Sequence, residues 1–272
     1  MEKKLRFDQS EVFYQSLGSG PTVMLVHGFA EDGWIWEKQV AKLLDHFRVL
    51  IPDLPGSGRS PFNGRLAGME GYADCLVGIL DAEKVDQTIL IGHSMGGYIA
   101  LALAQRYAGR LTGLGLFHST AYRDSSEKID TRRKAIEFIR THGSAPFLAQ
   151  SIPNLFSPTY SSQHPDWVGS LIQRYAHFNP DALCSYYQAM IDRPDRSAVL
   201  KAVAVPVLFV IGEQDKLIPM EDMLRQSQLP EISVIHVLES AAHMGMLEAP
   251  EQSSRILQEF ADHVSGKSIP LP

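Results

Sequence analysis

Short apolar runs alternate along the chain with segments whose apolar residues recur every three or four positions. The runs, rich in β-branched residues, predict buried strands, and the spaced segments predict amphipathic helices. The predicted strands cover residues 12–14, 22–26, 48–51, 88–91, 111–117, 205–211 and 232–238. The predicted helices cover residues 34–44, 69–80, 95–107, 221–228 and 250–264. This alternation predicts an α/β fold with a mostly parallel central sheet flanked by helices. The first strand, ahead of the turn at residues 18–21, is expected at the sheet edge.

One long stretch interrupts the alternation. Residues 121–196 contain no strand pattern, and their helical pattern is repeatedly broken by proline and glycine. We therefore predict a core formed by residues 1–120 and 197–272, with a helical cap inserted at 121–196. The stretch carries many aromatic side chains, which favours a mostly apolar pocket beneath it. Most of them are expected to pack the cap onto the core.

Composition and charge narrow the possible partners. The 272 residues are 44% hydrophobic, with a formal net charge of −6 and scattered charges. A nucleic-acid-binding protein usually carries a basic excess or stripe, so no nucleic-acid partner is expected. The one dense basic cluster, Arg132-Arg133-Lys134, is short and is interpreted as a solvated helix face.

Two further features bear on the compartment. Cys75 and Cys184 lie far apart and are interpreted as free buried thiols, which fits a reducing environment. The first residues carry positive charge without an apolar stretch behind it, unlike a secretory signal. The longest apolar run, residues 202–212, contains Pro206 and is too short to span a bilayer. We expect a cytoplasmic protein with no membrane partner.

The most informative motif lies between a buried strand and a helix. Residues 92–97 read Gly-His-Ser-Met-Gly-Gly, which fits the pattern G-x-S-x-G. A sharp strand-to-helix turn lifts the Ser94 hydroxyl clear of the sheet, where a base can reach it. The start of the following helix offers backbone N–H groups to a developing oxyanion. Neither a Walker-type lysine nor a G-x-G-x-x-G motif is present, so these glycines do not indicate a nucleotide site.

Three segments resemble motifs of the α/β-hydrolase family. Residues 92–97 resemble its nucleophile elbow, and His27-Gly28-Phe29 resembles its oxyanion loop. Residues 53–60, Asp-Leu-Pro-Gly-Ser-Gly-Arg-Ser, resemble its D-x-x-G-x-G-x-S turn. The resemblance covers essentially the whole chain and implies the α/β-hydrolase fold. Dehalogenases and epoxide hydrolases of this fold carry aspartate at the elbow. Because the elbow residue here is serine, the resemblance does not extend to their reactions.

The resemblance also implies a catalytic triad in the order Ser, Asp or Glu, His. Asp215 follows the strand at 205–211 and matches the G-x-x-D pattern of the family acid. Glu213 and Asp124 are the alternative carboxylates. His243, between the last strand and the last helix, matches the catalytic histidine. His118 also follows a strand and can approach the pocket, but the family pattern gives it no role as a base.

Two backbone N–H groups are expected to form the oxyanion hole. By resemblance they belong to Phe29 and to Met95, the residue after the nucleophile. His27 is expected to brace its loop by hydrogen bonding rather than to act in catalysis. Asp53 and Arg59 are expected to hold their own turn together, and His93 is given no catalytic role.

These residues predict a serine hydrolase that acts on a small carboxylic ester, lactone or thioester through an acyl-enzyme on Ser94. The expected partner is a small molecule with a carbonyl group, the expected assembly a monomer or homodimer, and no metal or organic cofactor is needed. One alternative is a C–C bond hydrolase or lyase of the same fold, which a charged residue in the pocket would favour. Arg132 is the candidate, although we expect it at the surface. Another alternative is a ligand-binding signalling protein that retains the triad.

Overall fold

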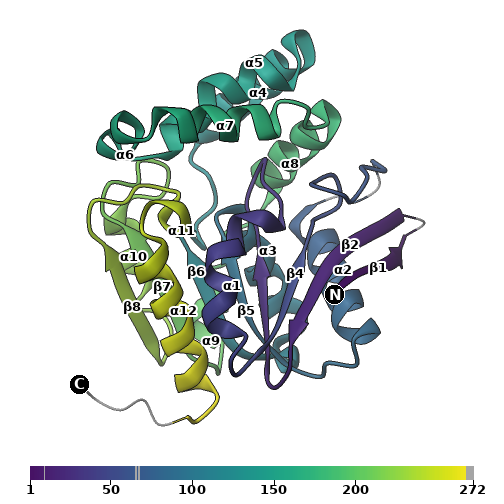
Figure 1. The fold of residues 1–272 in the computed structure, drawn as a ribbon, viewed down its shortest axis with the longest axis vertical. Coiled ribbons are helices and arrows are strands. Elements are labelled where there is room, and N and C mark those ends of the chain that lie inside the picture. The colour runs from purple at the N-terminus through teal and green to yellow at the C-terminus, as the bar shows by residue number, and fades with distance from the viewer. Residues whose placement is uncertain (9, 65, 67, 268–272) are drawn as a thin grey trace.

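One sheet of eight strands organises the part of the chain that the computed structural model describes, which is residues 1–272 without 9, 65, 67 and 268–272 (Figure 1). The strand order is β1-β2-β4-β3-β5-β6-β7-β8. The β1–β2 and β2–β4 pairs are antiparallel, and all other pairs are parallel. The strands are β1 Glu2–Phe7, β2 Ser10–Gly18, β3 Thr22–Val26, β4 Arg48–Pro52, β5 Thr88–His93, β6 Leu111–Phe117, β7 Val207–Gly212 and β8 Ser233–Leu238. This confirms the predicted α/β architecture with a mostly parallel sheet.

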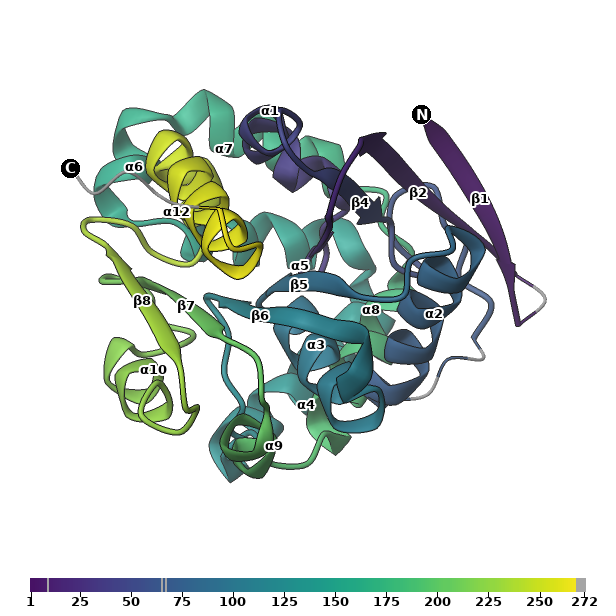
Figure 2. The same cartoon turned by 90° about the horizontal axis from the view of Figure 1, so that it is seen from below.

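Helices cover both faces of the sheet (Figure 2). Helices α1 (Glu37–Leu43) and α12 (Pro250–Val264) lie against one face, and α2 (Gly68–Ala82), α3 (Met95–Arg106), α9 (Ser197–Ala202) and α10 (Met220–Gln226) lie against the other. Short helices η1 (Gly33–Trp36), η2 (Ala108–Arg110) and α11 (Gly245–Glu248) complete the connections. Within the described ranges, no helix is both long enough and apolar enough to cross a membrane. Cys75 and Cys184 are buried and free, as predicted.

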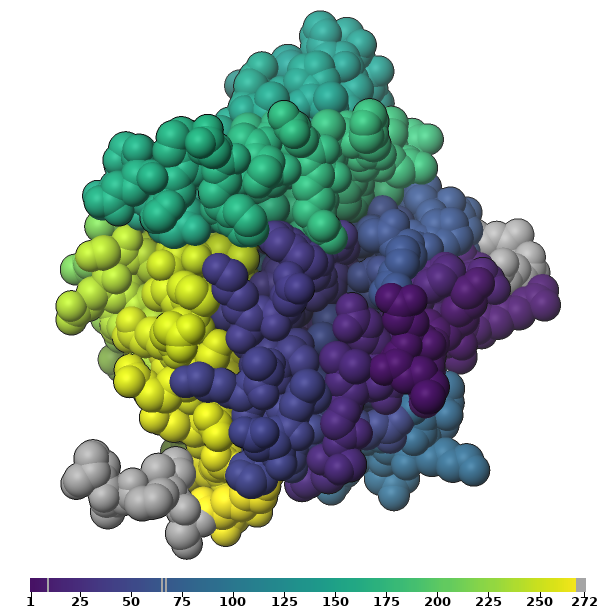
Figure 3. Space-filling view, in the orientation of Figure 1, coloured from purple at the N-terminus to yellow at the C-terminus, as the bar shows by residue number. Residues whose placement is uncertain are grey.

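A second layer of helices lies over one end of the sheet (Figure 1). It is formed entirely by the chain between β6 and α9, and Figure 3 shows it as a continuous teal and green cover. Its elements are α4 Ser126–His142, α5 Ser144–Ser151, η3 Ile152–Leu155, α6 Pro158–Gln163, α7 Pro165–Tyr175 and α8 Pro180–Asp192. The division at residues 121 and 196 stays a prediction. We call α4 to α8 with η3 the cap helices.

The sequence pattern failed mainly at the N-terminus. The strand expected at 12–14 is part of β2, which lies between β1 and β4 and is therefore not the sheet edge. The edge is β1, whose residues alternate between exposed and half-buried with none fully buried. A strand without a buried residue carries no apolar run, so hydrophobic patterning does not reveal it.

The parallel strands bring three loops to one edge of the sheet. Strands β5, β7 and β8 run in the same direction, so the loops that follow their carboxyl ends lie together. Ser94 directly follows β5, Asp215 follows β7, and His243 follows β8. The cap helices cover this same edge (Figure 1).

The turn at Ser94 is exceptionally crowded. Ser94 has φ +49°, in the left-handed region that non-glycine residues seldom adopt. A Cβ at Gly92 would overlap the backbone of Gly96 and Gly97. A Cβ at Gly96 would lie 2.5 Å from the carbonyl oxygen of Val26. Glycine is required at both positions because backbone, rather than flexible side chains, surrounds them.

We predict opposite effects for two glycine-to-alanine substitutions. Gly92→Ala should lower the free energy of unfolding by about 3 kcal/mol or more, because the new methyl group must displace backbone. Gly169→Ala, inside α7 where a Cβ would meet nothing within 4 Å, should raise it by about 1 kcal/mol through the higher helix propensity of alanine. Urea unfolding of both variants tests this. Equal stability of the two would contradict the packing described for the turn.

Candidate active site

A buried histidine–carboxylate pair joins two of the loops. His243 Nδ1 lies 2.8 Å from Asp215 Oδ2, and both side chains are almost completely buried. A carboxylate can only accept, so Nδ1 carries the proton that is shared with Asp215. This leaves Nε2 as the ring nitrogen that is free to accept a proton.

Asp215 is held from several sides. Its Oδ1 accepts hydrogen bonds from the backbone N–H of Leu217 at 2.9 Å and of Ile218 at 3.0 Å. His118 Nδ1 lies 3.5 Å from Oδ2, too far for a good hydrogen bond, and within the described chain neither ring nitrogen of His118 has a hydrogen-bond partner. Burial lowers the pKa of His118 to about 4, although the nearby Asp215 raises it, so this ring is neutral at neutral pH.

The pair shifts the pKa of both members. Burial raises the pKa of Asp215, but the charge of His243 and the contacts with His118 and His243 outweigh it, so the pKa lies well below its ordinary value. Burial lowers the pKa of His243, but the charge of Asp215 and its hydrogen bond outweigh it, so the pKa is raised above its ordinary value. For His243, the carboxylate of Asp215 therefore has a larger effect than burial, and the net shift of the pKa is upward.

The two alternative carboxylates are engaged elsewhere. Glu213 Oε2 accepts from the backbone N–H of Ser240 at 3.0 Å. Asp124 forms ion pairs with Arg132 and Arg193. Of the three candidates, only Asp215 has a hydrogen bond to His243.

Ser94, His243 and Phe29 line one cavity of about 390 Å³. The Ser94 hydroxyl makes no hydrogen bond within the described chain, while the backbone oxygen of Ser94 accepts from Ser119 Oγ at 2.7 Å. The backbone N–H groups of Phe29 and Met95 likewise donate to no acceptor in the described ranges. Met95 is the first residue of α3, where helix geometry leaves the N–H groups unpaired.

The loop that carries Phe29 is braced as predicted. His27 Nε2 accepts a hydrogen bond from the backbone N–H of Leu54 at 3.0 Å. In the next turn, Asp53 Oδ2 accepts from Arg59 through its backbone N–H at 3.1 Å and its Nε at 3.2 Å. The hydrogen bonds expected of His27 and of the Asp53–Arg59 turn are therefore present.

A buried network at the same site escaped the sequence patterns. Glu31 Oε2 accepts from the backbone N–H of Gly28 at 2.6 Å and lies 3.0 Å from His93 Nδ1. The other ring nitrogen, His93 Nε2, lies 3.0 Å from the backbone oxygen of His243. Both ring nitrogens thus face oxygen acceptors. Glu31 and His93 link the Phe29 loop, the Ser94 turn and the His243 loop.

Glu31 is ionised in this network. Burial raises the pKa of its carboxyl, but the neighbouring His93, and to a smaller extent His27 and the Gly28 N–H, lower it below its ordinary value. The sequence signal for this residue was only its place four positions after His27. No motif assigned it a partner, because the pairing depends on a residue 62 positions away.

The cap supplies most of the cavity wall. Its apolar part includes side chains from α5, η3, α7 and α8, among them Phe147, Ile152, Tyr175, Tyr187 and Met190. Other cap aromatics serve packing: Tyr186 is buried and its hydroxyl donates to the backbone oxygen of Pro55 at 2.7 Å. The cap aromatics therefore divide between the cavity and the contact with the core.

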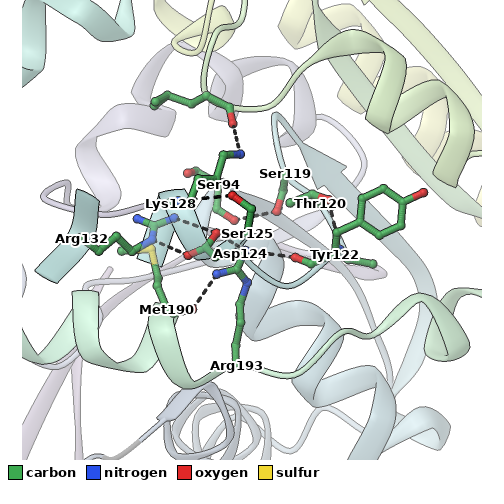
Figure 4. Close-up of polar contacts among 12 residues, drawn as sticks. Ser94, Ser119, Thr120, Tyr122, Asp124, Ser125, Lys128, Arg132, Met190 and Arg193 are labelled. Atoms are coloured by element: carbon green, nitrogen blue, oxygen red, sulfur yellow. Dashed lines mark hydrogen bonds and ion pairs between the residues drawn. The ribbon is translucent and has the colours of Figure 1, made fainter. Parts of the chain in front are cut away.

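The expectation of a surface position for Arg132 was wrong. Arg132 lines the cavity, and its side chain is only 19% exposed. Figure 4 shows its guanidinium directed to Asp124, with Lys128 and Ser94 nearby. Its neighbour Arg133 is 66% exposed, as a solvated helix face requires. Adjacent helical residues point about 100° apart, so their place in one basic cluster did not show that Arg132 and Arg133 have different surroundings.

The cap is also hydrogen-bonded to the histidine loop. The backbone N–H of His243 donates to the backbone oxygen of Leu155, in η3, at 2.9 Å. Glu248 accepts from the backbone N–H of Ser157 at 2.9 Å through one carboxylate oxygen and from that of Ala242 at 3.0 Å through the other. The loop of His243 is thus held between the sheet and the cap.

Comparison with known proteins agrees with this geometry. Residues 21–250 match the family model of the alpha/beta hydrolase fold. The chain therefore belongs to the α/β-hydrolase fold family, and it is a hydrolase.

Named relatives span several reactions. The chain is 31% identical over 220 residues to a putative carbamate hydrolase of Pantoea ananatis. The aligned region covers 76% of this chain and 78% of the relative. It is 28% identical to a 2-hydroxy-6-oxo-2,4-heptadienoate hydrolase of Pseudomonas putida, over 92% of each chain. Among solved structures, a malate-bound thermophilic esterase from Thermogutta terrifontis superposes with a TM-score of 0.91 at 32% identity, covering 97% of this chain and 99% of the other.

We predict that Glu31→Gln lowers the free energy of unfolding by roughly 1.5–3 kcal/mol at neutral pH, because it removes the buried carboxylate that accepts from the Gly28 N–H and faces His93 Nδ1. The matched control is Glu221→Gln, which removes an exposed helical ion pair with Arg225 and should cost less than about 1 kcal/mol. Because the folded pKa of Glu31 is depressed, its contribution is complete above the unfolded pKa of about 4.3 and is lost as pH falls through the folded pKa.

Urea unfolding at several pH values measures these differences. The gap between the wild-type protein and Glu31→Gln should narrow below about pH 4. A loss at neutral pH no larger than that of Glu221→Gln would contradict a buried carboxylate held by hydrogen bonds.

Proposed function

We propose that this protein is a serine hydrolase that cleaves a small carboxylic ester through an acyl-enzyme on Ser94. The observation that carries the proposal is the buried His243–Asp215 pair, whose histidine lines the cavity together with a serine on a strand-to-helix turn. A serine hydroxyl is a weak nucleophile until a positioned base removes its proton. Lactones and thioesters present the same carbonyl chemistry and remain within the proposal.

The residues divide the work as follows. His243 Nε2 takes the proton of the Ser94 hydroxyl as Oγ attacks the carbonyl carbon. Asp215 keeps the Nδ1–H tautomer and stabilises the imidazolium that forms. His243 then gives the proton to the departing alkoxide, and the acyl group remains on Ser94. A water molecule, deprotonated by His243, attacks the acyl carbon, and His243 returns that proton to Ser94 Oγ as the bond to the acyl group breaks and the carboxylic acid leaves.

The oxyanion is assigned to the backbone N–H groups of Phe29 and Met95. Support comes from their position at the nucleophile and from the absence of acceptors for them within the described residues. Donors that are already unpaired need not break a hydrogen bond to meet the developing charge. One such donor contributes about 3–4 kcal/mol to transition-state stabilisation in other serine hydrolases.

A second candidate is hydrolysis of a C–C bond next to a carbonyl. One observation favours it: a charged residue, Arg132, lines the cavity. The Pseudomonas putida relative is named a 2-hydroxy-6-oxo-2,4-heptadienoate hydrolase, while the Thermogutta terrifontis neighbour is named an esterase. We favour the ester because the residues assigned above suffice for it. Turnover of a vinylogous diketone in the absence of ester turnover would reverse this order.

The proposal predicts a single reactive serine. A fluorophosphonate should label the protein once, at Ser94, because this is the hydroxyl that we propose loses its proton to His243. Ser94→Ala should abolish labelling, whereas Ser151→Ala, which removes another serine of the same cavity, should keep it. Intact-protein and peptide mass spectrometry locate the label. Labelling that survives Ser94→Ala would refute the assignment of the nucleophile.

A further inference from the structure

Two cationic side chains lie on the cavity side of α4. Lys128 and Arg132 are four residues apart, so they occupy the same face of the helix, and both line the cavity that contains Ser94 (Figure 4). Lys128 is exposed as well as cavity-lining, which places it where the cavity meets solvent, while Arg132 is largely buried.

The carboxylates around them do not balance this charge. Asp124 is shared: Arg132 Nε donates to Oδ2 at 2.5 Å and Arg193 Nη2 donates to Oδ1 at 2.9 Å. Lys128 Nζ donates at 2.9 Å to a neutral acceptor, the backbone oxygen of Leu217, and forms no ion pair within the described chain. Three cations therefore surround one carboxylate.

Other acidic groups near the cavity are already compensated or distant from α4. Glu31 lines the cavity but is paired with His93, and Asp215 is paired with His243. Asp222 also acts on Lys128 and raises its pKa. Burial is nonetheless the largest influence on Lys128, and together with Arg132 and Arg193 it leaves the pKa of Lys128 lowered.

Arg132 retains unused donors. Its Nε and Nη2 both reach Asp124, whereas Nη1 has no acceptor in the described part of the chain. Its guanidinium carbon lies 5.5 Å from the centre of the Tyr187 ring, within the range of a cation–π contact with this aromatic wall of the cavity. An arginine that served only to neutralise Asp124 would be redundant with Arg193, whose side chain is 3% exposed.

We propose that Arg132 and Lys128 bind a carboxylate of the substrate, so that the compound cleaved at Ser94 is an anionic half-ester or a comparable acyl compound. The proposal rests on the function assigned to Ser94 and narrows its substrate class. A carboxylate would accept from the free Arg132 Nη1 and from Lys128, and it would complete the charge balance of this end of the cavity.

The test compares matched anionic and neutral esters. In one series the carboxylate lies in the acyl part, as in the mono-p-nitrophenyl esters of succinate, glutarate and adipate. In the other it lies in the alcohol part, as in acetoxy-acids of the same lengths. Each anion is matched with its neutral primary amide. In at least one series, kcat/KM for the anion should exceed that of its amide by roughly 10- to 100-fold, the range expected for one hydrogen bond to a charged group.

Variants of Arg132 and Lys128 test whether the preference for the anion over its amide depends on these two residues. Arg132→Gln and Lys128→Gln should each reduce the ratio of kcat/KM for the anion to kcat/KM for its amide by tenfold or more. Arg132→Lys should retain part of the preference for the anion, because the positive charge is kept. Arg133→Gln, on the exposed face of the same helix, is the control and should keep the full preference. Since Lys128 has no ion pair to lose in the described structure, its variant remains informative if Arg132→Gln does not fold.

A binding measurement separates this proposal from the proposed function. Calorimetry with Ser94→Ala should detect binding of monomethyl glutarate. The affinity of this variant for dimethyl glutarate should be at least tenfold weaker. The affinity of the double variant Ser94→Ala, Arg132→Gln for monomethyl glutarate should likewise be at least tenfold weaker. Ester turnover that requires Ser94 but does not distinguish anion from amide in either series would overturn the subsite and leave the serine hydrolase intact. Binding of the anion that requires Arg132, without any ester turnover, would support the subsite and overturn the hydrolysis of esters.

Discussion

The carboxylate of Asp215 is the interaction on which the arrangement of the site depends. It is buried, yet it stays ionised because two backbone N–H groups and His243 donate to it. An unpaired buried carboxylate would be strongly destabilising, so these donors fix both the loop after β7 and the ring of His243. His118 closes the remaining side as a neutral ring without hydrogen-bond partners of its own in the described structure.

A second buried carboxylate, that of Glu31, organises the loop that carries Phe29. Glu31 connects the Phe29 loop to His93, and His93 in turn contacts the backbone oxygen of His243. The crowded turn at Ser94 lies between these two carboxylate networks. The backbone hydrogen bond from His243 to Leu155 then attaches the whole group to the cap. The cap therefore forms the cavity wall and also restrains the loop that carries His243.

The sequence predicted the parts that depend on local patterns. The strand at 22–26 agrees with β3 to the residue, because a continuous apolar run bounded by turn residues has few alternatives. The Ser94 turn, and the Asp215–His243 pairing expected from family resemblance, appeared in the geometry for the same reason: each residue follows a strand in the parallel part of the sheet.

Features that depend on distant partners were missed or misjudged. Strand β1 has no buried residue, and its place is set by pairing with β2. Glu31 and His93 gained their partners only in the folded chain. Arg132 looked like part of a solvated basic cluster, because the direction of a helix face depends on what the helix packs against. The boundaries of the cap stay predictions, and so do the chemical roles assigned to the five site residues, Ser94, Asp215, His243, Phe29 and Met95.

The most direct test of the central claim is the pH dependence of kcat/KM for one activated ester in the wild-type protein, Asp215→Asn and Glu213→Gln. Because Asp215 raises the pKa of His243, the wild-type rate should fall as pH drops through a midpoint above about 6.5. Asp215→Asn should reduce kcat by roughly four orders of magnitude, while Glu213→Gln should stay near the wild type. A rate that rises towards acid in a folded protein, or an Asp215→Asn variant that keeps most of its activity, would contradict the account.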